Sequence, residues 1–264
     1  MLPLKVSLLQ SPLHWQDPAA NITHFDNLIR SGQPSDLWVL PEMFTSGFTM
    51  QPAKVAQEMD GEAVSWMVKT ARELDTAIGG SLVITENGAF YNRFVFVKSS
   101  GEINTYDKRH LFTLAGEQNF YSAGEQRTEV MLKGWKISLQ VCYDLRFPVF
   151  TRNSAANAYD LLIYVANWPE PRINAWSRLL VARAIENQCY VIGVNRTGND
   201  DNGMPYNGQS AVIDPYGEYL VEPTDAEGVF SAHLDKDKLM DFREKFPVLK
   251  DADLFRLGFQ QDPL

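Results

Sequence analysis

The feature of this sequence that most restricts its fold is a strand–helix–strand pattern that occurs in both halves of the chain. In the first half, apolar segments at 4–10 and 36–40 flank a helical pattern at 19–30. In the second half, similar segments lie at 135–140 and 159–165, and we expect a helix between them. Strands joined in this way normally form right-handed parallel crossovers. The pattern predicts an α/β protein with two similar halves and leaves open whether they arose by internal duplication.

Turn signals predict antiparallel strands beside the parallel ones. Glu86-Asn87-Gly88 separates two strand-like segments, and Asn and Gly tolerate the positive φ angles of hairpin turns. Asp214-Pro-Tyr-Gly217 predicts a second hairpin. The remaining expected elements are strands at 78–85, 90–98, 102–110, 189–195 and 229–234, a hairpin at 210–221, and helices at 61–74, 174–188 and 235–245. Early alternation with helices and late hairpins predict mixed sheets covered by helices.

Length and composition favour one folded unit. The 264 residues correspond to between one and two average domains, and no low-complexity linker divides them. We therefore expect residues 1–264 to form a single domain. The tail after Phe246 is apolar and is expected to dock on the rest of the molecule. Its apolar side chains are Leu254, Phe255, Leu257 and Phe259.

The charge balance excludes several classes of partner. With 24 Lys and Arg against 33 Asp and Glu, the net charge is −9, which opposes sequence-independent phosphate binding, so no nucleic-acid partner is expected. No segment approaches the ~20 apolar residues of a membrane span, and the first ten residues lack the pattern of a signal peptide. We expect a cytoplasmic protein without a membrane partner, whose Cys142 and Cys189 are free thiols.

Reactive side chains follow several of the predicted strands. Glu42 lies just beyond the segment at 36–40, Cys142 follows a buried strand, and Asn167 follows another. Lys108 lies near the end of the predicted strand at 102–110. Because α/β sheets present their sites at the carboxyl ends of strands, these side chains are expected to converge.

Two nucleophilic arrangements are compatible with these residues. A reactive thiol needs a base or a cation beside it, and Cys142 has charged neighbours in sequence, whereas Cys189 begins an apolar strand and is expected to be a core residue. On a strand, His110 would share a face with Lys108, which allows a Cys142/His110 pair. The residues alone leave this pair and a Glu42/Lys108/Cys142 set both open. No metal-ligand spacing or glycine-rich phosphate loop is found.

Three segments, in order, resemble the signature segments of the nitrilase superfamily of carbon–nitrogen hydrolases. They are Leu40-Pro-Glu-Met-Phe44, Tyr106-Asp-Lys-Arg-His-Leu-Phe112 and Val141-Cys-Tyr-Asp-Leu-Arg-Phe-Pro148. Each segment is a loose match, but the three in order are specific. The likeness extends from the first strand to Phe246-Pro247, and within the superfamily it is greatest to the omega-amidase group.

The resemblance implies a fold and a catalytic set. The fold would be a four-layer α-β-β-α sandwich of two mixed sheets covered by helices, which forms a homodimer. The catalytic residues would be Glu42, Lys108 and Cys142. The family has a second glutamate, for which Glu117 is the best match and Glu125 the alternative. His110 would then be a scaffold residue.

The implied reaction is amide hydrolysis through a cysteine thioester. Glu42 would take the proton of Cys142, and Lys108 and the backbone N–H of Tyr143 would stabilise the oxyanion. The partners would be a small amide substrate and water, and the scheme uses no metal or cofactor.

The implied substrates are omega-amides of 2-oxo dicarboxylates, such as 2-oxoglutaramate and 2-oxosuccinamate. Their free carboxylate suits an arginine, and Arg172 is the expected partner. Phe44 and Trp168 are expected to wall the pocket. Arg146 is expected to form an ion pair with Asp144 or another acid.

Two further functions stay open. An N-carbamoyl-amine hydrolase or a nitrilase would use the same Glu-Lys-Cys set, and a catalytically silent small-molecule-binding protein could share the fold. The segment at 197–207, rich in Gly, Asn and Asp, is expected to be either a loop that closes over the site or a plain surface loop.

Overall fold

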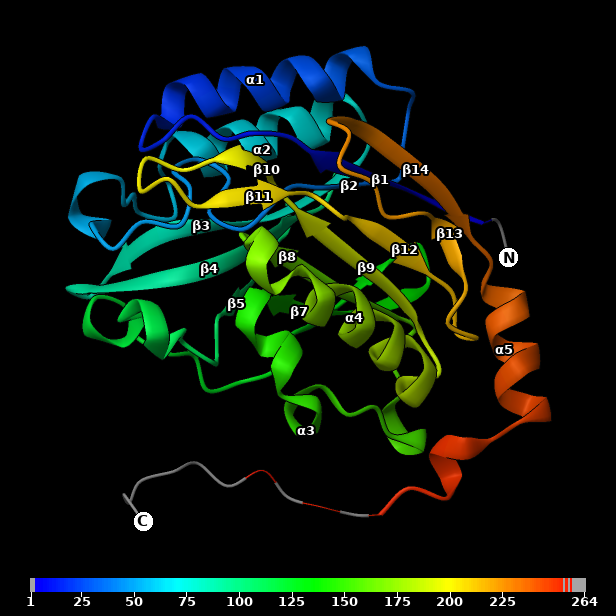
Figure 1. Cartoon of the computed structure of the whole chain (residues 1–264). Helices are drawn as coiled ribbons and strands as arrows, with labels where there is room; N and C mark the ends of the chain where they lie inside the picture. Colours follow the sequence, from blue (N-terminus) through cyan, green and yellow to red (C-terminus); the bar gives the residue numbers. More distant parts are fainter. Residues whose placement is uncertain (1–2, 254, 256, 258–264) are drawn as a thin grey trace.

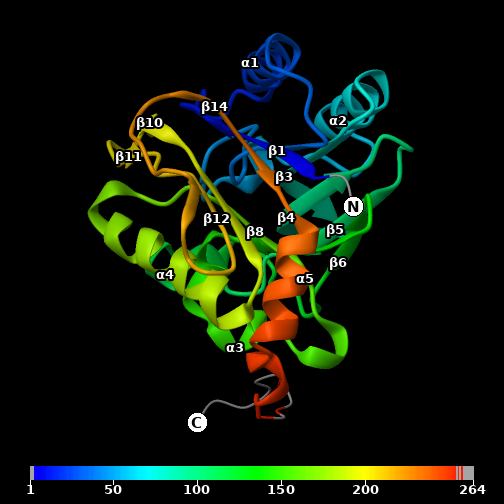
Figure 2. The same cartoon turned by 90° about the vertical axis from the view of Figure 1, so that its right-hand side faces the viewer.

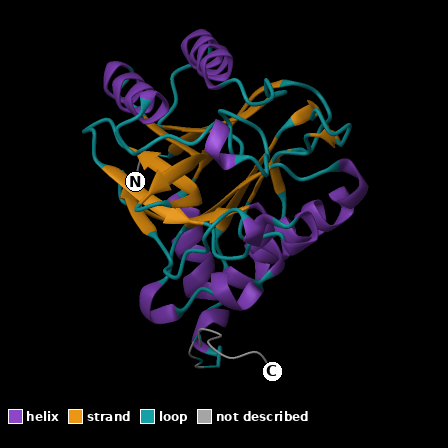
Figure 3. Cartoon of the chain, turned by 90° about the vertical axis from the view of Figure 1, so that its left-hand side faces the viewer, coloured by secondary structure: helices purple, strands orange, loops and turns teal. Residues whose placement is uncertain are grey.

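Two mixed sheets lie face to face between layers of helices in the computed structural model, which describes residues 3–253, 255 and 257 (Figures 1 and 3). Helices α1 (Pro18–Ser31) and α2 (Glu62–Glu73) cover the outer face of the first sheet, and α4 (Ile173–Asn187) covers the second. The expected α-β-β-α sandwich is confirmed. Helix α5 (Lys236–Lys245) lies at one edge (Figure 2). In the described part of the chain, no helix is long and apolar enough to cross a membrane.

The two sheets have the same pattern of strand directions. Each has three parallel strands at its centre. One further strand pairs antiparallel on one side, and two successive strands pair antiparallel on the other. The first sheet runs β14 (Gly228–Leu234), β1 (Leu4–Gln10), β2 (Leu37–Val39), β3 (Ala77–Glu86), β4 (Ala89–Val97) and β5 (Ile103–Asp107). The second runs β6 (Glu129–Leu132), β7 (Trp135–Val141), β8 (Leu161–Ala166), β9 (Tyr190–Asn195), β12 (Ala211–Ile213) and β13 (Tyr219–Val221).

A shared hydrogen bond extends the likeness to side chains. The backbone N–H of Lys5 donates to the carboxylate of Asp36 over 2.8 Å, and that of Lys136 donates to Asp160 over 3.0 Å. Asp36 directly precedes β2, and Asp160 directly precedes β8. Each aspartate therefore ties two neighbouring parallel strands together in the same way, β1 to β2 and β7 to β8. The prediction of two similar halves is confirmed for the topology.

Two predicted elements differ from the structure, and one strand was not predicted. The helix expected in the second crossover is reduced to a single turn: between β7 and β8 the described residues form 3-10 turns and the short helix α3 (Pro148–Thr151). Proline starts this helix but disfavours helical backbone in the residue before it, which separates α3 from the turn that follows β7. Strand β5 ends at Asp107 rather than residue 110, and β6 was not predicted.

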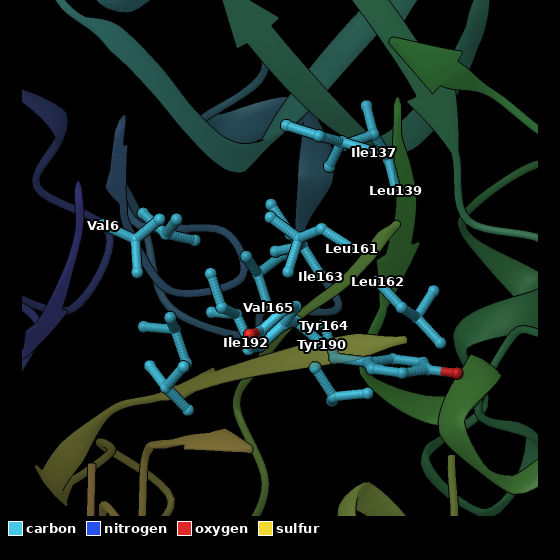
Figure 4. Close-up of a cluster of buried hydrophobic side chains, with 14 of the residues drawn as sticks. Val6, Ile137, Leu139, Leu161, Leu162, Ile163, Tyr164, Val165, Tyr190 and Ile192 are labelled. Carbon is cyan, nitrogen blue, oxygen red and sulfur yellow. The ribbon is translucent and has the colours of Figure 1, made fainter. Parts of the chain in front are cut away.

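The apolar core lies between the sheets. Side chains from β7, β8 and β9 form a buried apolar cluster together with Val6 of β1 (Figure 4). Cys189, which precedes β9, is fully buried in this cluster, as expected. In the apolar tail, Leu254 and Phe259 lie outside the described residues. Leu257 contributes to a hollow of about 230 Å³ beside Phe150, although its side chain stays 39% exposed.

Candidate active site

Four side chains predicted at strand ends are brought together at the carboxyl ends of the parallel strands and of β5. Cys142 directly follows β7, and Asn167 directly follows β8 in the second sheet. Glu42 follows β2, and Lys108 directly follows β5 in the first sheet. All four are buried, with exposed fractions from 0% for Glu42 to 9% for Cys142. The site is therefore assembled from both sheets.

Lys108 lies between two buried carboxylates. Its Nζ is 3.0 Å from Oε1 of Glu42 and 2.9 Å from Oε2 of Glu117. Glu117 occupies a 3-10 turn, and its Oε2 also accepts the backbone N–H of Phe112. Glu125, the alternative second glutamate, is exposed. The geometry thus places Glu117 at the lysine and leaves Glu125 outside the cluster.

The charges of this cluster stabilise one another. Burial alone would lower the pKa of Lys108, but the carboxylates of Glu117 and Glu42 outweigh it and raise that pKa. Burial raises the pKa of Glu117, with Lys108 opposing and Glu42 adding to the rise. Lys108 is therefore a fixed positive charge, because losing its proton would leave two buried carboxylates without a counterion.

Cys142 is held in a strained backbone conformation beside the cluster. Its φ of 45° lies in the left-handed region, which non-glycine residues rarely adopt and which is common at functional sites. Burial and the hydrogen-bonded carboxylate of Glu42 raise the pKa of the thiol, while Lys108 opposes the rise. The resting side chain is a neutral thiol, so its attack on a substrate requires a base.

Asp144 ties the turn after Cys142 to the segment that carries Lys108. Its Oδ2 accepts the hydroxyl of Tyr106 over 2.8 Å and the backbone N–H of Val141 over 3.0 Å. Its Oδ1 accepts the backbone N–H of His110 over 2.9 Å. The residues on either side of Lys108 are thereby fixed against the residues on either side of Cys142.

The Cys142/His110 pairing is wrong for this structure. Strand β5 has ended before Lys108, so strand alternation does not bring the two side chains to one face. The His110 ring lies 2.7 Å from Asp144 through Nδ1 and stacks on Phe147 with centroids 3.8 Å apart. The histidine is a scaffold residue beside the turn.

Two asparagines hold Glu42. The backbone N–H of Asn167 donates to Oε2 of Glu42 over 2.7 Å, and its side-chain amide donates to the Glu42 carbonyl over 2.6 Å. The side-chain amide of Asn92, in β4, donates to Oε1 over 2.7 Å. Asn92 was not identified from the sequence. An asparagine within a mostly apolar strand was the signal that could have identified it.

A cavity of about 330 Å³ opens onto Cys142 and Lys108. Of the predicted substrate-binding residues, Trp168 and Arg172 line it, and so does Tyr143, the predicted oxyanion donor. Phe44 does not, and the expectation that it walls the pocket is wrong. Its ring is fully buried against Phe25 of α1 and Trp66 of α2, because it points away from the second sheet into the core under these helices.

Arg146 also lines this cavity, and the expected ion pair with Asp144 is not formed. The Asp144 carboxylate is occupied by Tyr106, His110 and Val141. The guanidinium of Arg146 instead lies 4.9 Å from the ring centroid of Trp168, and that of Arg172 lies 5.3 Å from the centroid of Phe112. Within the described residues, neither arginine is paired with a carboxylate.

The segment at 197–207 forms a hairpin of β10 (Thr197–Asn199) and β11 (Pro205–Asn207) that borders the cavity. Asp200, Met204 and Tyr206 line the cavity from this hairpin. The carboxylate of Asp200 accepts the backbone N–H of Met204 over 3.0 Å and lies 3.2 Å from the Tyr206 hydroxyl. The hairpin is therefore an ordered wall of the cavity, a role that the sequence left undecided.

Comparisons with known proteins agree with this geometry. Residues 5–244 match the carbon-nitrogen hydrolase family model. The chain is 48% identical to the omega-amidase YafV of Escherichia coli (strain K12) over 96% of this chain and 98% of that protein. It is 37% identical to the 2-oxoglutaramate amidase of Bacillus subtilis (strain 168), over 93% and 96%.

Among solved structures, XC1258 from Xanthomonas campestris is 44% identical, covers 98% of this chain and 100% of its own, and superposes with a TM-score of 0.94. XC1258 is a CN-hydrolase superfamily protein with an arsenic adduct in its active site. Sequence, fold and strand-end cluster agree, and the chain belongs to the carbon-nitrogen hydrolase family.

Proposed function

We propose that this chain is an omega-amidase, a thiol amidohydrolase that releases ammonia from the omega-amides of 2-oxo dicarboxylates. The observation that carries the proposal is the thiol of Cys142, which lies beside the buried carboxylate of Glu42 and opens onto a cavity with two arginines that lack carboxylate partners among the described residues. The names of the relatives YafV and 2-oxoglutaramate amidase support the same activity.

The proposed reaction passes through a thioester. Glu42 accepts the thiol proton of Cys142 as the sulfur attacks the amide carbon. The carbon–nitrogen bond breaks when Glu42 returns the proton to the nitrogen, which leaves as ammonia. Water then gives a proton to Glu42 and a hydroxyl to the thioester carbon, the carbon–sulfur bond breaks, and the sulfur regains its proton.

Charge around the cluster supports this sequence of steps. The fixed positive charge of Lys108 and the backbone N–H of Tyr143 are proposed to stabilise the oxyanion of each tetrahedral intermediate. Glu117 is proposed to support Lys108, because two carboxylates hold the ammonium more firmly than one. No step uses a metal or a cofactor.

Arg146 and Arg172 are proposed to bind the carboxylate at the far end of the substrate. Each guanidinium lies over an aromatic ring, Trp168 or Phe112, which supports its flat face and leaves its N–H edge for a planar anion. Arg172 was expected in this role, and Arg146 joins it because Asp144 is engaged elsewhere.

Ammonia release from a panel of amides tests the function. The panel contains 2-oxoglutaramate, an uncharged amide of the same length, an N-carbamoyl amino acid and a nitrile. We expect the largest kcat/KM for 2-oxoglutaramate. A preference for the carbamoyl compound or the nitrile would identify the related hydrolases, and no turnover of any compound would indicate a silent binding protein.

Arginine variants test the proposed carboxylate site. Arg146→Ala and Arg172→Ala should each raise KM for 2-oxoglutaramate by ~10-fold or more, since each removes a charge-assisted hydrogen bond. KM for the uncharged amide should change little. Arg178→Ala is the matched control, because Arg178 is an exposed arginine of α4 that does not line the cavity. Equal losses for both substrates would place the carboxylate site elsewhere.

We also propose that the protein is a cytoplasmic homodimer. The two thiols without a disulfide support a reducing compartment, and the resemblance to the family supports a dimer. Light scattering of the purified chain tests the dimer, and a fluorescent fusion observed in intact cells tests the location.

A further inference from the structure

Asn92 lies behind the site, between its two carboxylates, and does not line the cavity. It is fully buried in β4. Its Nδ2 is 2.7 Å from Oε1 of Glu42 and 3.4 Å from Oε1 of Glu117. One side-chain amide therefore contacts both acids that flank Lys108.

The orientation of this amide is set by a directed chain of hydrogen bonds. The backbone N–H of Met43 donates to Oγ of Ser81 over 2.8 Å, which leaves the serine proton free. Ser81 donates that proton to Oδ1 of Asn92 over 2.8 Å. A flipped amide would place its NH₂ group against a hydroxyl proton and its oxygen against a carboxylate, so the NH₂ group is fixed toward the acids.

This series of hydrogen bonds begins and ends in the loop that follows β2. Met43 directly follows Glu42, Ser81 lies in β3 and Asn92 in β4, so three neighbouring segments of the first sheet fix one carboxylate. Oε1 of Glu42 accepts from Asn92 and Lys108, and Oε2 accepts the backbone N–H of Asn167. These three donors hold the carboxylate of Glu42 in one orientation.

We propose that Asn92 is a positioning residue that keeps Glu42 oriented for its work as a base beside Glu117 and Lys108, and that this cluster as a whole sets the acidic limb of the pH–rate profile. The inference rests on the proposed amidase function. The groups that face Glu42 are Lys108 after β5, Glu117 in its 3-10 turn and Cys142 after β7, with Tyr121 and the hairpin's Tyr206 farther away. Asn92 adds a neutral side-chain donor to these groups.

Two substitutions of the same residue test this role. Asn92→Leu removes the donor at similar volume, and the acidic limb of kcat/KM for 2-oxoglutaramate should move up by about one pH unit. Asn92→Asp places a third carboxylate in the cluster and should move the limb further in the same direction. KM should change little in either variant, because Asn92 does not line the cavity. An unmoved limb in folded Asn92→Leu and Asn92→Asp overturns the proposal.

A second residue and a matched control separate positioning from structural support. Ser81→Ala leaves the amide in place but frees its orientation, so the limb should move in the same direction by a smaller amount. This variant also serves if the Asn92 variants do not fold. Asn153→Leu is the control, since Asn153 is buried and bonds the carbonyls of Tyr159 and Asn187, away from the site. It should lower the melting temperature without moving the limb.

The outcomes distinguish this inference from the proposed function. If the wild-type protein hydrolyses 2-oxoglutaramate and the limb is the same in all variants, only the role of Asn92 fails. Movement of the limb by the same amount in Asn153→Leu also overturns it, because the shift would then report general destabilisation. If the wild-type protein releases no ammonia from any amide, the proposed function itself fails.

Discussion

The two cysteines lie at opposite ends of the parallel strands of the second sheet, and only one of them has a carboxylate and a cavity beside it. Strands β7, β8 and β9 are parallel; Cys142 follows β7, whereas Cys189 precedes β9. Both thiols are buried, and burial raises the pKa of both. Only Cys142 has a buried carboxylate hydrogen-bonded to it and a cavity beside it. Burial therefore does not distinguish the two thiols. What distinguishes them is the end of the parallel strands at which each one lies.

The largest expected difference between the two thiols is catalytic. Cys142→Ala should lower kcat for 2-oxoglutaramate by ~10⁴-fold or more, because the thioester cannot form without the sulfur. Cys189→Ala should leave kcat nearly unchanged, since Cys189 does not contact the site. Ammonia release by the two purified variants, with circular dichroism to verify folding, measures both. Residual activity near the wild-type level in Cys142→Ala would remove the contrast.

Alkylation should reveal a smaller difference between the two thiols, in their labelling rates, and should show that the rate at Cys142 depends on Glu42. Iodoacetamide should label Cys142 in the native protein and label Cys189 only after unfolding, because Cys189 is fully buried. In Glu42→Gln the labelling of Cys142 should slow by about tenfold or more, since the neutral thiol has lost its base. Peptide mass spectrometry over time follows both sites. Equal labelling rates in Glu42→Gln and the wild type would show that another group activates the thiol.

The smallest expected effect is a pH dependence of the free energy of unfolding, which the two thiols share. Because burial raises the pKa of Cys189, the unfolded chain loses this proton first, near pH ~8.5. The thiol's contribution to the free energy of unfolding is therefore complete below that pH and declines above it, by at most about 1.4 kcal/mol per pH unit.

Urea unfolding on either side of that pH tests this effect. The difference in free energy of unfolding between the wild type and Cys189→Ala should shrink between about pH 8 and pH 10. The Cys142→Ala comparison should shrink in the same sense, because burial raises that thiol's pKa too. A difference that stays constant with pH would mean that the buried thiol ionises as readily as the unfolded one.

Much of the fold was predictable because it depends on local patterns. Buried parallel strands appear as apolar runs, and the Asn87-Gly88 turn adopts the positive φ angles that its sequence predicts. The carboxyl ends of strands then located Glu42 and Cys142 without knowledge of a family. The interpretation of residues 1–264 as one domain stays a prediction.

The residues that were missed depend on partners far away in the sequence. Asn92 meets Glu42 across 50 residues, which no local pattern encodes. Arg146 was expected to pair with Asp144 or another acid, but Asp144 is occupied by Tyr106 and His110. Glu117 was preferred to Glu125 on the family resemblance, although both lie in similar loop sequence, and the fold places Glu117 beside Lys108.

Strand β14 has a consequence for how the chain becomes active during synthesis. Its pairing places Leu4 opposite Leu234, so the first sheet lacks one of its strands until residue 234 has left the ribosome. Contacts of such large sequence separation are slow to form. We expect the first sheet, from which Glu42 and Lys108 project, to be completed only when this strand is added.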